Sequence, residues 1–184
     1  MEKIIFGRTG LEITRSAFGA LPIQRLSMND AAKLLRAAYD GGINFFDTAR
    51  VYSDSEEKMA LGLSDVRHGI IIATKTQAAT AEKLRADLEK SLTNLKTDYI
   101  DIYQLHNPKE PPAADSELYA ELFKAREEGK IRFISITCHK LTNARAALES
   151  GLYDTIQYPL SALSSDEEIA FAKECEKRNI GVSR

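Results

Sequence analysis

The chain has 184 residues, 43% of them hydrophobic, which is enough for one substantial core and calls for no second domain. Its 25 basic and 27 acidic residues are mixed along the chain, and no apolar run reaches the roughly 18 residues of a membrane span, so we expect small-molecule partners and neither nucleic acid nor membrane. The two cysteines, Cys138 and Cys175, offer no metal-ligand spacing and no disulfide framework, which predicts no metal site and a reducing, cytoplasmic location.

The opening stretch predicts a β-hairpin around Thr9 and Gly10, which would close the floor of the fold. After it, apolar strand-like runs alternate with helix-like segments that begin at polar residues, namely Ser27 or Asn29, then Ser55 and Thr80. The strands are expected near residues 14–19, 43–47, 69–75, 99–105, 131–136, 154–158 and 180–184. The helices are expected near residues 29–40, 55–64, 80–94, 116–128, 141–150 and 165–178.

Strands that alternate with helices predict an α/β fold with a parallel sheet and right-handed crossovers. About six repeats are complete and a seventh strand begins, so the fold class is an incomplete parallel (β/α)8 barrel of the TIM type, one domain over residues 1–184 that lacks the last repeats. A closed barrel takes at least about 200 residues. Because open sheet edges are normally covered, we expect the chain to be either a fragment of a longer protein or completed by another chain, as in a homo-oligomer.

Three consecutive predicted strands each end on an ionisable residue, namely Asp47, Lys75 and His106. The spacings are 28 and 31 residues, each one strand–helix repeat. Because the carboxyl ends of barrel strands meet at one mouth, these side chains should converge on a shared pocket, where nearby Tyr52 would add a phenol. Taken singly, each residue is better explained as an ion pair, rim packing or a structural histidine. The repeat spacing favours a common site for proton transfer.

Other polar residues of these strands are interpreted as structural. If His106 points into the barrel, strand alternation turns Asp101 toward the helices, where it would serve as a hydrogen-bonding residue. His68 begins a strand at the end opposite the mouth. The proline-rich stretch 107–115 follows His106 directly and predicts an irregular loop at the mouth.

Several short motifs occur in a specific order and spacing along nearly the whole chain. They are Gly7–Leu11, Gly41–Ala49 followed by Tyr52 and Ser55–Glu56, Ile72–Lys75, Ser91–Leu92 with Leu95, Asp98–Asp101, Leu105–His106 and Gly129–Arg132. Each is weak alone, but together they closely resemble the aldo-keto reductase family. The resemblance implies a barrel enzyme that reduces an aldehyde or ketone to an alcohol with a nicotinamide cofactor, usually NADPH, with NADH as the alternative.

By position, Asp47, Tyr52, Lys75 and His106 match the catalytic tetrad of that family. Tyr52 would protonate the carbonyl oxygen, although a free phenol with a pKa of about 10 is a slow donor at neutral pH. The ammonium of Lys75 would lower the pKa of Tyr52, and Asp47 would keep Lys75 charged and oriented. His106 would hydrogen-bond the substrate oxygen and fix its direction.

The resemblance also places Thr137, Cys138 and Gln157 at the nicotinamide carboxamide of the cofactor. Thr137 can hydrogen-bond, but Cys138 is a poor replacement for an amide and is equally explained as a small buried filler, whereas His139 next to it could supply a donor or acceptor. Gln157 could instead be ordinary strand-end polarity. In barrels the phosphate-binding loops follow strands seven and eight, so we expect this chain alone to bind the dinucleotide weakly or not at all.

Three functions are compatible with these observations. The first is an aldo-keto reductase acting on a small carbonyl substrate, whose identity the mouth loops would set. The second is a non-catalytic truncated barrel, or an assembly or regulatory subunit like the reductase-like subunits attached to channels. The third, an isomerase or aldolase that uses Lys75 as a Schiff base, rests only on shared architecture.

Overall fold

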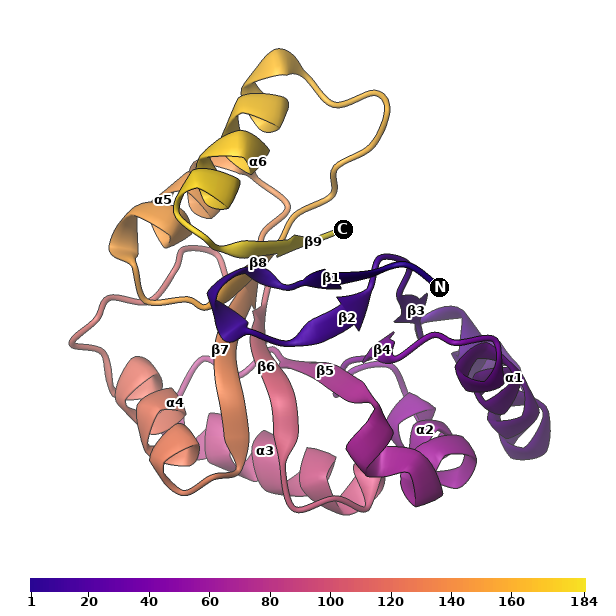
Figure 1. Cartoon of the computed structure of the whole chain (residues 1–184). Helices are drawn as coiled ribbons and strands as arrows, with labels where there is room; N and C mark the ends of the chain where they lie inside the picture. The colour runs from indigo at the N-terminus through magenta and orange to yellow at the C-terminus, as the bar shows by residue number, and fades with distance from the viewer.

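The centre of the molecule is a sheet of seven parallel strands in chain order, curled into an incomplete barrel (Figure 1). The computed structural model describes residues 1–184. The strands are β3 (Phe18–Gly19), β4 (Phe45–Asp47), β5 (Ile71–Thr76), β6 (Ile100–His106), β7 (Ile131–Thr137), β8 (Thr155–Gln157) and β9 (Gly181–Ser183). The edge strands β3 and β9 do not pair with each other. The predicted fold class, an incomplete TIM-type barrel, is confirmed.

One helix follows each strand from β3 to β8 and covers the outer face of the sheet. The helices are α1 (Met28–Asp40), α2 (Ser55–Leu63), α3 (Ala81–Leu95), α4 (Glu117–Glu127), α5 (Leu141–Ser150) and α6 (Asp166–Lys177). Ser27 and Thr80 cap α1 and α3 as predicted, because each side chain accepts a hydrogen bond from a backbone N–H of the first turn. None of the helices combines the length and apolar character needed to cross a membrane.

The predicted amino-terminal hairpin is present. It consists of β1 (Lys3–Ile5) and β2 (Glu12–Thr14), which pair antiparallel. The single strand expected over 14–19 is wrong in part, because Arg15 N still bonds to Glu2 O and so continues the hairpin. The chain must then bend before it enters the barrel, and only Phe18–Gly19 pair with β4.

The hairpin closes the end of the barrel at which the strands begin, on the side of the sheet opposite α2, α3 and α4 (Figure 1). The ring of Phe6 lies 5.7 Å from that of Phe45, at the start of β4. Arg8 Nη2 donates a hydrogen bond to Tyr153 O at 2.5 Å, just before β8. Gly7 must be glycine, since its φ is +54° and a Cβ would lie 2.2 Å from the backbone nitrogen of Gly181.

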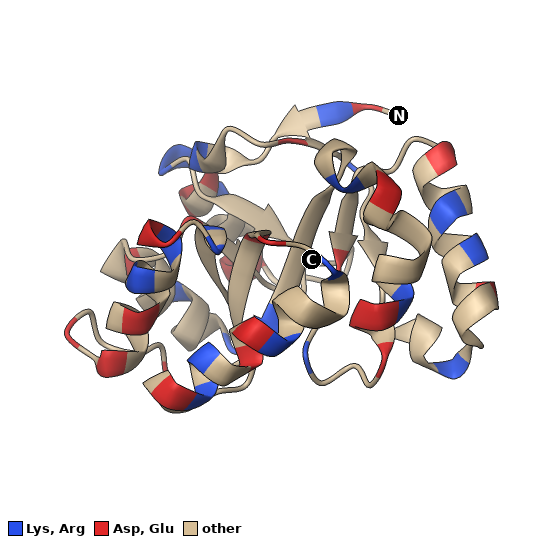
Figure 2. Ribbon diagram, turned by 90° about the horizontal axis from the view of Figure 1, so that it is seen from below, with Lys and Arg blue, Asp and Glu red and all other residues tan.

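Apolar residues form two cores, one on each face of the sheet. The larger cluster lies between the sheet and the helices, and includes Phe46, Leu35 and Ile134. The smaller fills the barrel floor beneath the hairpin; its buried members are Phe6, Leu11, Ile13, Phe45, Ala73 and Ile102. Charged residues lie mostly on helices and loops, while the strands are largely free of them (Figure 2). The few charges buried at the strands therefore need an explanation.

Candidate active site

The carboxyl ends of the strands bring the predicted site residues to one mouth. Asp47 ends β4, Lys75 lies one residue before the end of β5, and His106 ends β6. Lys75 is the register partner of Gln104 on β6, and His106 is that of Thr137 on β7. Because side chains alternate between the two faces of a strand, these residues share the inward face.

Asp47 and Lys75 form a buried ion pair. Lys75 Nζ donates to Asp47 Oδ2 at 2.5 Å and to Thr48 O at 2.8 Å. The Lys75 side chain is only 2% exposed. Burial lowers the pKa of Lys75, because the charged form loses hydration, and the carboxylate of Asp47 offsets part of this effect.

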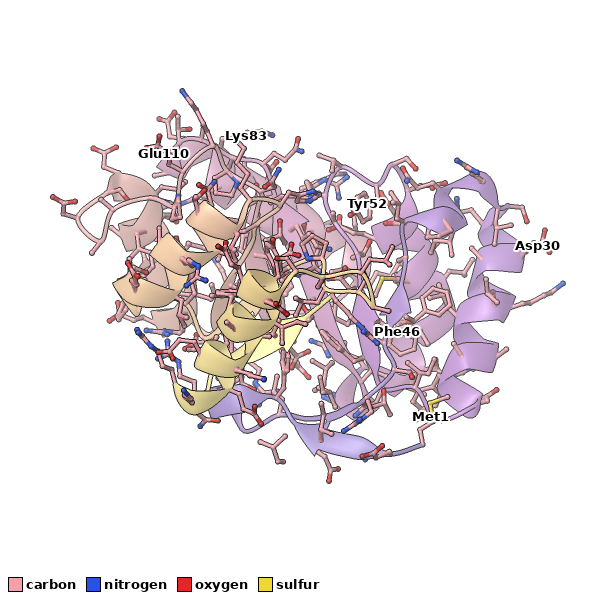
Figure 3. All side chains as sticks on the ribbon, turned by 90° about the horizontal axis from the view of Figure 1, so that it is seen from above. Met1, Asp30, Phe46, Tyr52, Lys83 and Glu110 are labelled. Carbon is pink, nitrogen blue, oxygen red and sulfur yellow. The ribbon has the colours of Figure 1, made fainter.

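Tyr52 and His106 complete the group. Lys75 Nζ lies 5.4 Å from the centroid of the Tyr52 ring, and the rings of Tyr52 and His106 are 5.8 Å apart and nearly perpendicular. In Figure 3, Tyr52 lies between Glu110 on one side of the molecule and Asp30 on the other. The structure thus brings together the four residues predicted for proton transfer, while their catalytic roles stay predictions.

The protonation states differ from the expectation in one respect. Burial, and then the carboxylate of Asp47, raise the pKa of Tyr52, whereas Lys75 was expected to lower it. The ammonium is engaged by Asp47 and a backbone carbonyl and lies near the Tyr52 ring, which accounts for the difference. Burial, followed by the charge of Lys75, lowers the pKa of His106. At neutral pH the phenol is therefore protonated and the imidazole is neutral.

A buried carboxylate holds the loop that carries Tyr52. Glu56, 1% exposed, accepts hydrogen bonds from Thr74 Oγ1 at 2.8 Å and Asn94 Nδ2 at 3.2 Å, and it pairs with Arg50. Arg50 and Glu56 lie on either side of Tyr52 in the chain, so their contact closes the loop and ties it to β5 and α3. The sequence motif contained Glu56, but no signal in the sequence paired it with Arg50.

Two further polar residues near the site were missed. Gln104 is 2% exposed and donates Nε2 to Asp47 Oδ1 at 2.9 Å. Its alternation with His106 along one strand was a usable signal for an inward position. Lys58, 1% exposed, donates Nζ to Asp54 at 2.6 Å and to Ile23 O at 3.1 Å, which fastens the loop after β3 to α2.

The residues predicted to bind the cofactor occupy different environments. Thr137 is 3% exposed, faces the barrel interior, and its Oγ1 is buried without a hydrogen-bond partner. Gln157 is its half-buried register partner on β8. Cys138 instead belongs to the apolar cluster between sheet and helices, where burial raises the pKa of its thiol to about 12. This position agrees with the alternative interpretation of Cys138 as a filler.

A cavity of about 430 Å³ lies beside His106, between the loops 76–79 and 107–112. Polar and apolar groups share its lining, including Gln77, Lys109 and Leu118. The loop after β6 has no regular helix or strand before α4, as the prolines predicted. A pocket therefore lies next to His106, whereas Tyr52, Lys75 and Asp47 do not line it. Asp101 and His68 lie elsewhere: Asp101 binds two arginines on the outer face, and His68 stacks on Tyr99.

The fold and this mouth define a parallel barrel with a tyrosine, lysine, aspartate and histidine site. The sequence profile described as the Aldo/keto reductase family matches residues 3–183. The chain belongs to this family of oxidoreductases, as its motifs predicted.

Individual proteins resemble the chain in sequence or in fold. L-galactose dehydrogenase of Arabidopsis thaliana is 35% identical over 148 residues, which cover 71% of this chain and 46% of the relative. A probable voltage-gated potassium channel subunit beta of Oryza sativa subsp. japonica is 30% identical over 118 residues, which cover 55% of this chain and 36% of the relative. An aldo-keto reductase of Klebsiella pneumoniae, solved in complex with NADPH, superposes with a TM-score of 0.86 at 23% identity, covering 98% of this chain and 66% of that structure. The chain spans about half the length of the curated relatives it matches.

Proposed function

We propose that this chain carries the catalytic residues of an NAD(P)H-dependent reductase that converts an aldehyde or ketone to an alcohol. The observation that supports the proposal most strongly is the convergence of Asp47, Tyr52, Lys75 and His106 at one mouth. A protonated phenol can act as the general acid toward a carbonyl oxygen, and a neutral imidazole can hydrogen-bond that oxygen.

The proposed chemistry divides between the cofactor and the chain. The nicotinamide, when bound, supplies a hydride to the carbonyl carbon. The phenol of Tyr52 gives its proton to the carbonyl oxygen, and the imidazole of His106 hydrogen-bonds that oxygen and fixes its direction. Lys75, held by Asp47, places a positive charge 5.4 Å from the centroid of the Tyr52 ring, beside the group that gives up the proton.

The residues at the mouth fit a nicotinamide cofactor. The unpartnered Oγ1 of Thr137 is a buried polar atom on the inward face, and Gln157 lies beside it. Both could hydrogen-bond a carboxamide, whereas Cys138 on the other face contributes packing only. We propose NADPH as the preferred cofactor because the Klebsiella pneumoniae relative of this fold is a complex with NADPH. The proposal concerns one domain over residues 1–184.

The experiment that tests this function is the Tyr52→Phe substitution in the complete gene product. Oxidation of NADPH is followed with an aromatic aldehyde, and cofactor binding is measured separately. We expect turnover to be abolished while cofactor binding is spared. Tyr99→Phe, which changes a tyrosine at the floor end of the barrel, is the matched control and should keep its activity. Near-normal turnover of Tyr52→Phe would refute the proton-donor role.

A second candidate function is assembly with another protein. The observation that favours it is the 30% identity to a probable channel subunit beta, although this match covers only 55% of the chain. Absence of turnover in the complete gene product, with a folded protein and bound cofactor, would favour assembly over catalysis.

A further inference from the structure

A row of polar side chains crosses the barrel directly beneath the mouth. Lys75, Gln104, Ser135 and Thr155 are register partners on β5, β6, β7 and β8. Each of these four residues is at most 2% exposed, so contact with solvent does not explain why polar side chains occur here. The next inward row toward the floor is apolar and consists of Ala73, Ile102 and Phe133. Burying a polar group costs free energy unless the group is hydrogen-bonded, and apolar residues would fill this space without that cost. The hydrogen bonds made by this row therefore need to be accounted for.

Gln104 connects this row to the ion pair. Its Nε2 donates to Asp47 Oδ1 at 2.9 Å, and its Oε1 lies 3.3 Å from Ser135 Oγ, whose single proton is shared with the closer Thr155 O at 2.9 Å. Asp47 therefore has one oxygen on Lys75 and the other on Gln104, with the two donors coming from adjacent strands. The opposite amide orientation would set two oxygens against each other, so the carboxylate itself selects the orientation of the amide.

We propose that Gln104 is a positioning residue of the proton-transfer site, which fixes the carboxylate of Asp47 on the ammonium of Lys75. The catalytic consequence of this inference rests on the proposed function, whereas its geometric part does not. A carboxylate held at only one oxygen can rotate about its side chain. The interaction between two charges falls with distance and is strong where water is excluded, so a small displacement weakens the pair.

The same row links the proton-donating side of the site to the strands proposed to hold the cofactor. Thr155 Oγ1 donates to Ser135 Oγ at 2.7 Å, which continues the network from Gln104 across β7 to β8. Ser135 and Thr155 precede Thr137 and Gln157 by two residues on the same strands and the same face. The network therefore links side chains of the five neighbouring strands β4 to β8 at the level just below the reacting groups.

The test is the titration of Lys75, followed by NMR of isotopically labelled lysine and assigned with Lys75→Arg. The ionisable groups around the ammonium are Asp47 from β4, Tyr52 from the following loop and His106 from β6. Gln104→Leu removes the donor that holds Asp47 and should move the pKa of Lys75 further down, because burial then acts with less compensation. Gln104→Glu adds a second carboxylate and should move the pKa of Lys75 up.

The matched control is Gln24→Leu, since the half-buried Gln24 side chain lies outside the barrel site and bonds only Leu21 O, at 3.0 Å. It should leave the titration of Lys75 unchanged. If Gln104→Leu fails to fold, Gln104→Met replaces it with an unbranched side chain of similar length. If the pKa of Lys75 is unchanged in both Gln104→Leu and Gln104→Glu, the proposal is overturned. A loss of stability in these variants without a change in that pKa would show that Gln104 only contributes packing. The readout needs no turnover, so retained activity of Tyr52→Phe would refute the proposed function while leaving this test intact.

Discussion

Asp101 can be used to test how much a buried carboxylate on the outer face of the sheet contributes to stability. Its carboxylate is fully buried on the outer face of β6. Oδ2 accepts from Arg67 Nη2 at 2.8 Å and from Ile72 N at 3.0 Å, and Oδ1 accepts from Arg132 Nη1 at 2.7 Å. The substitution Asp101→Ala removes all of these contacts at once and leaves the donors in place.

The expected cost follows from the exposure of each partner. The Arg67 side chain is 8% exposed, so its guanidinium would become a buried charge without a counter-ion. Removing one partner of a buried ion pair costs about 3–5 kcal/mol. The Arg132 side chain is 46% exposed, so water compensates for most of that second loss, which adds about 0–1 kcal/mol. We therefore expect Asp101→Ala to lower the free energy of unfolding by about 3–5 kcal/mol.

Urea unfolding monitored by circular dichroism measures this free energy. Asp65→Ala is the matched control, because it removes an aspartate that pairs with Arg36 on the surface. That pair is exposed to water, so its loss should have a much smaller effect. A loss below about 1 kcal/mol for Asp101→Ala, similar to that of the control, would refute the reasoning that this buried carboxylate fastens β6.

Two further predictions concern helix packing and pH. Gly62→Ala should lower the free energy of unfolding by about 1–3 kcal/mol, and with it the melting temperature, because a Cβ would lie 2.9 Å from Ala32 O. This steric cost outweighs the roughly 1 kcal/mol by which alanine favours a helix over glycine, so an unchanged or higher melting temperature would contradict the prediction. Burial, then Lys75, lowers the pKa of His106 below its ordinary 6.5, so the unfolded chain binds more protons and stability should fall as the pH drops below 6.5. In His106→Gln this part of the pH dependence should disappear from unfolding curves; an equally steep dependence in the variant would count against it.

The architecture could be predicted from the sequence to a large extent. Apolar strand runs that alternate with capped amphipathic segments can satisfy their backbones and bury their apolar faces in few ways, so the parallel order from β3 to β9 followed directly. The exception was the stretch 14–19, where one extended run divides between the hairpin and β3. Local patterns mark extended chain equally well in both places, and the hydrogen bond from Arg15 to Glu2 shows where the hairpin ends.

The convergence of Asp47, Lys75 and His106 could also be predicted, because the repeat length and the barrel topology together decide which strand ends are neighbours. The partners of these residues could not. Gln104 reaches Asp47 across β5, and Glu56 reaches Arg50, Thr74 and Asn94, only because of the stagger between strands and the path of one loop. The direction of the pKa shift of Tyr52 likewise depends on its burial and on where the Lys75 ammonium lies.

By itself, then, the sequence determined the order of the strands, the family and the residues that end each strand at the mouth. These features follow from short-range periodicity and from a topology that admits few alternatives. Only the tertiary structure decided which polar groups touch, how deeply each is buried and which protonation states they hold. Hydrogen bonds and desolvation depend on distances of a few tenths of an ångström between segments far apart in the chain, and no local pattern encodes those distances.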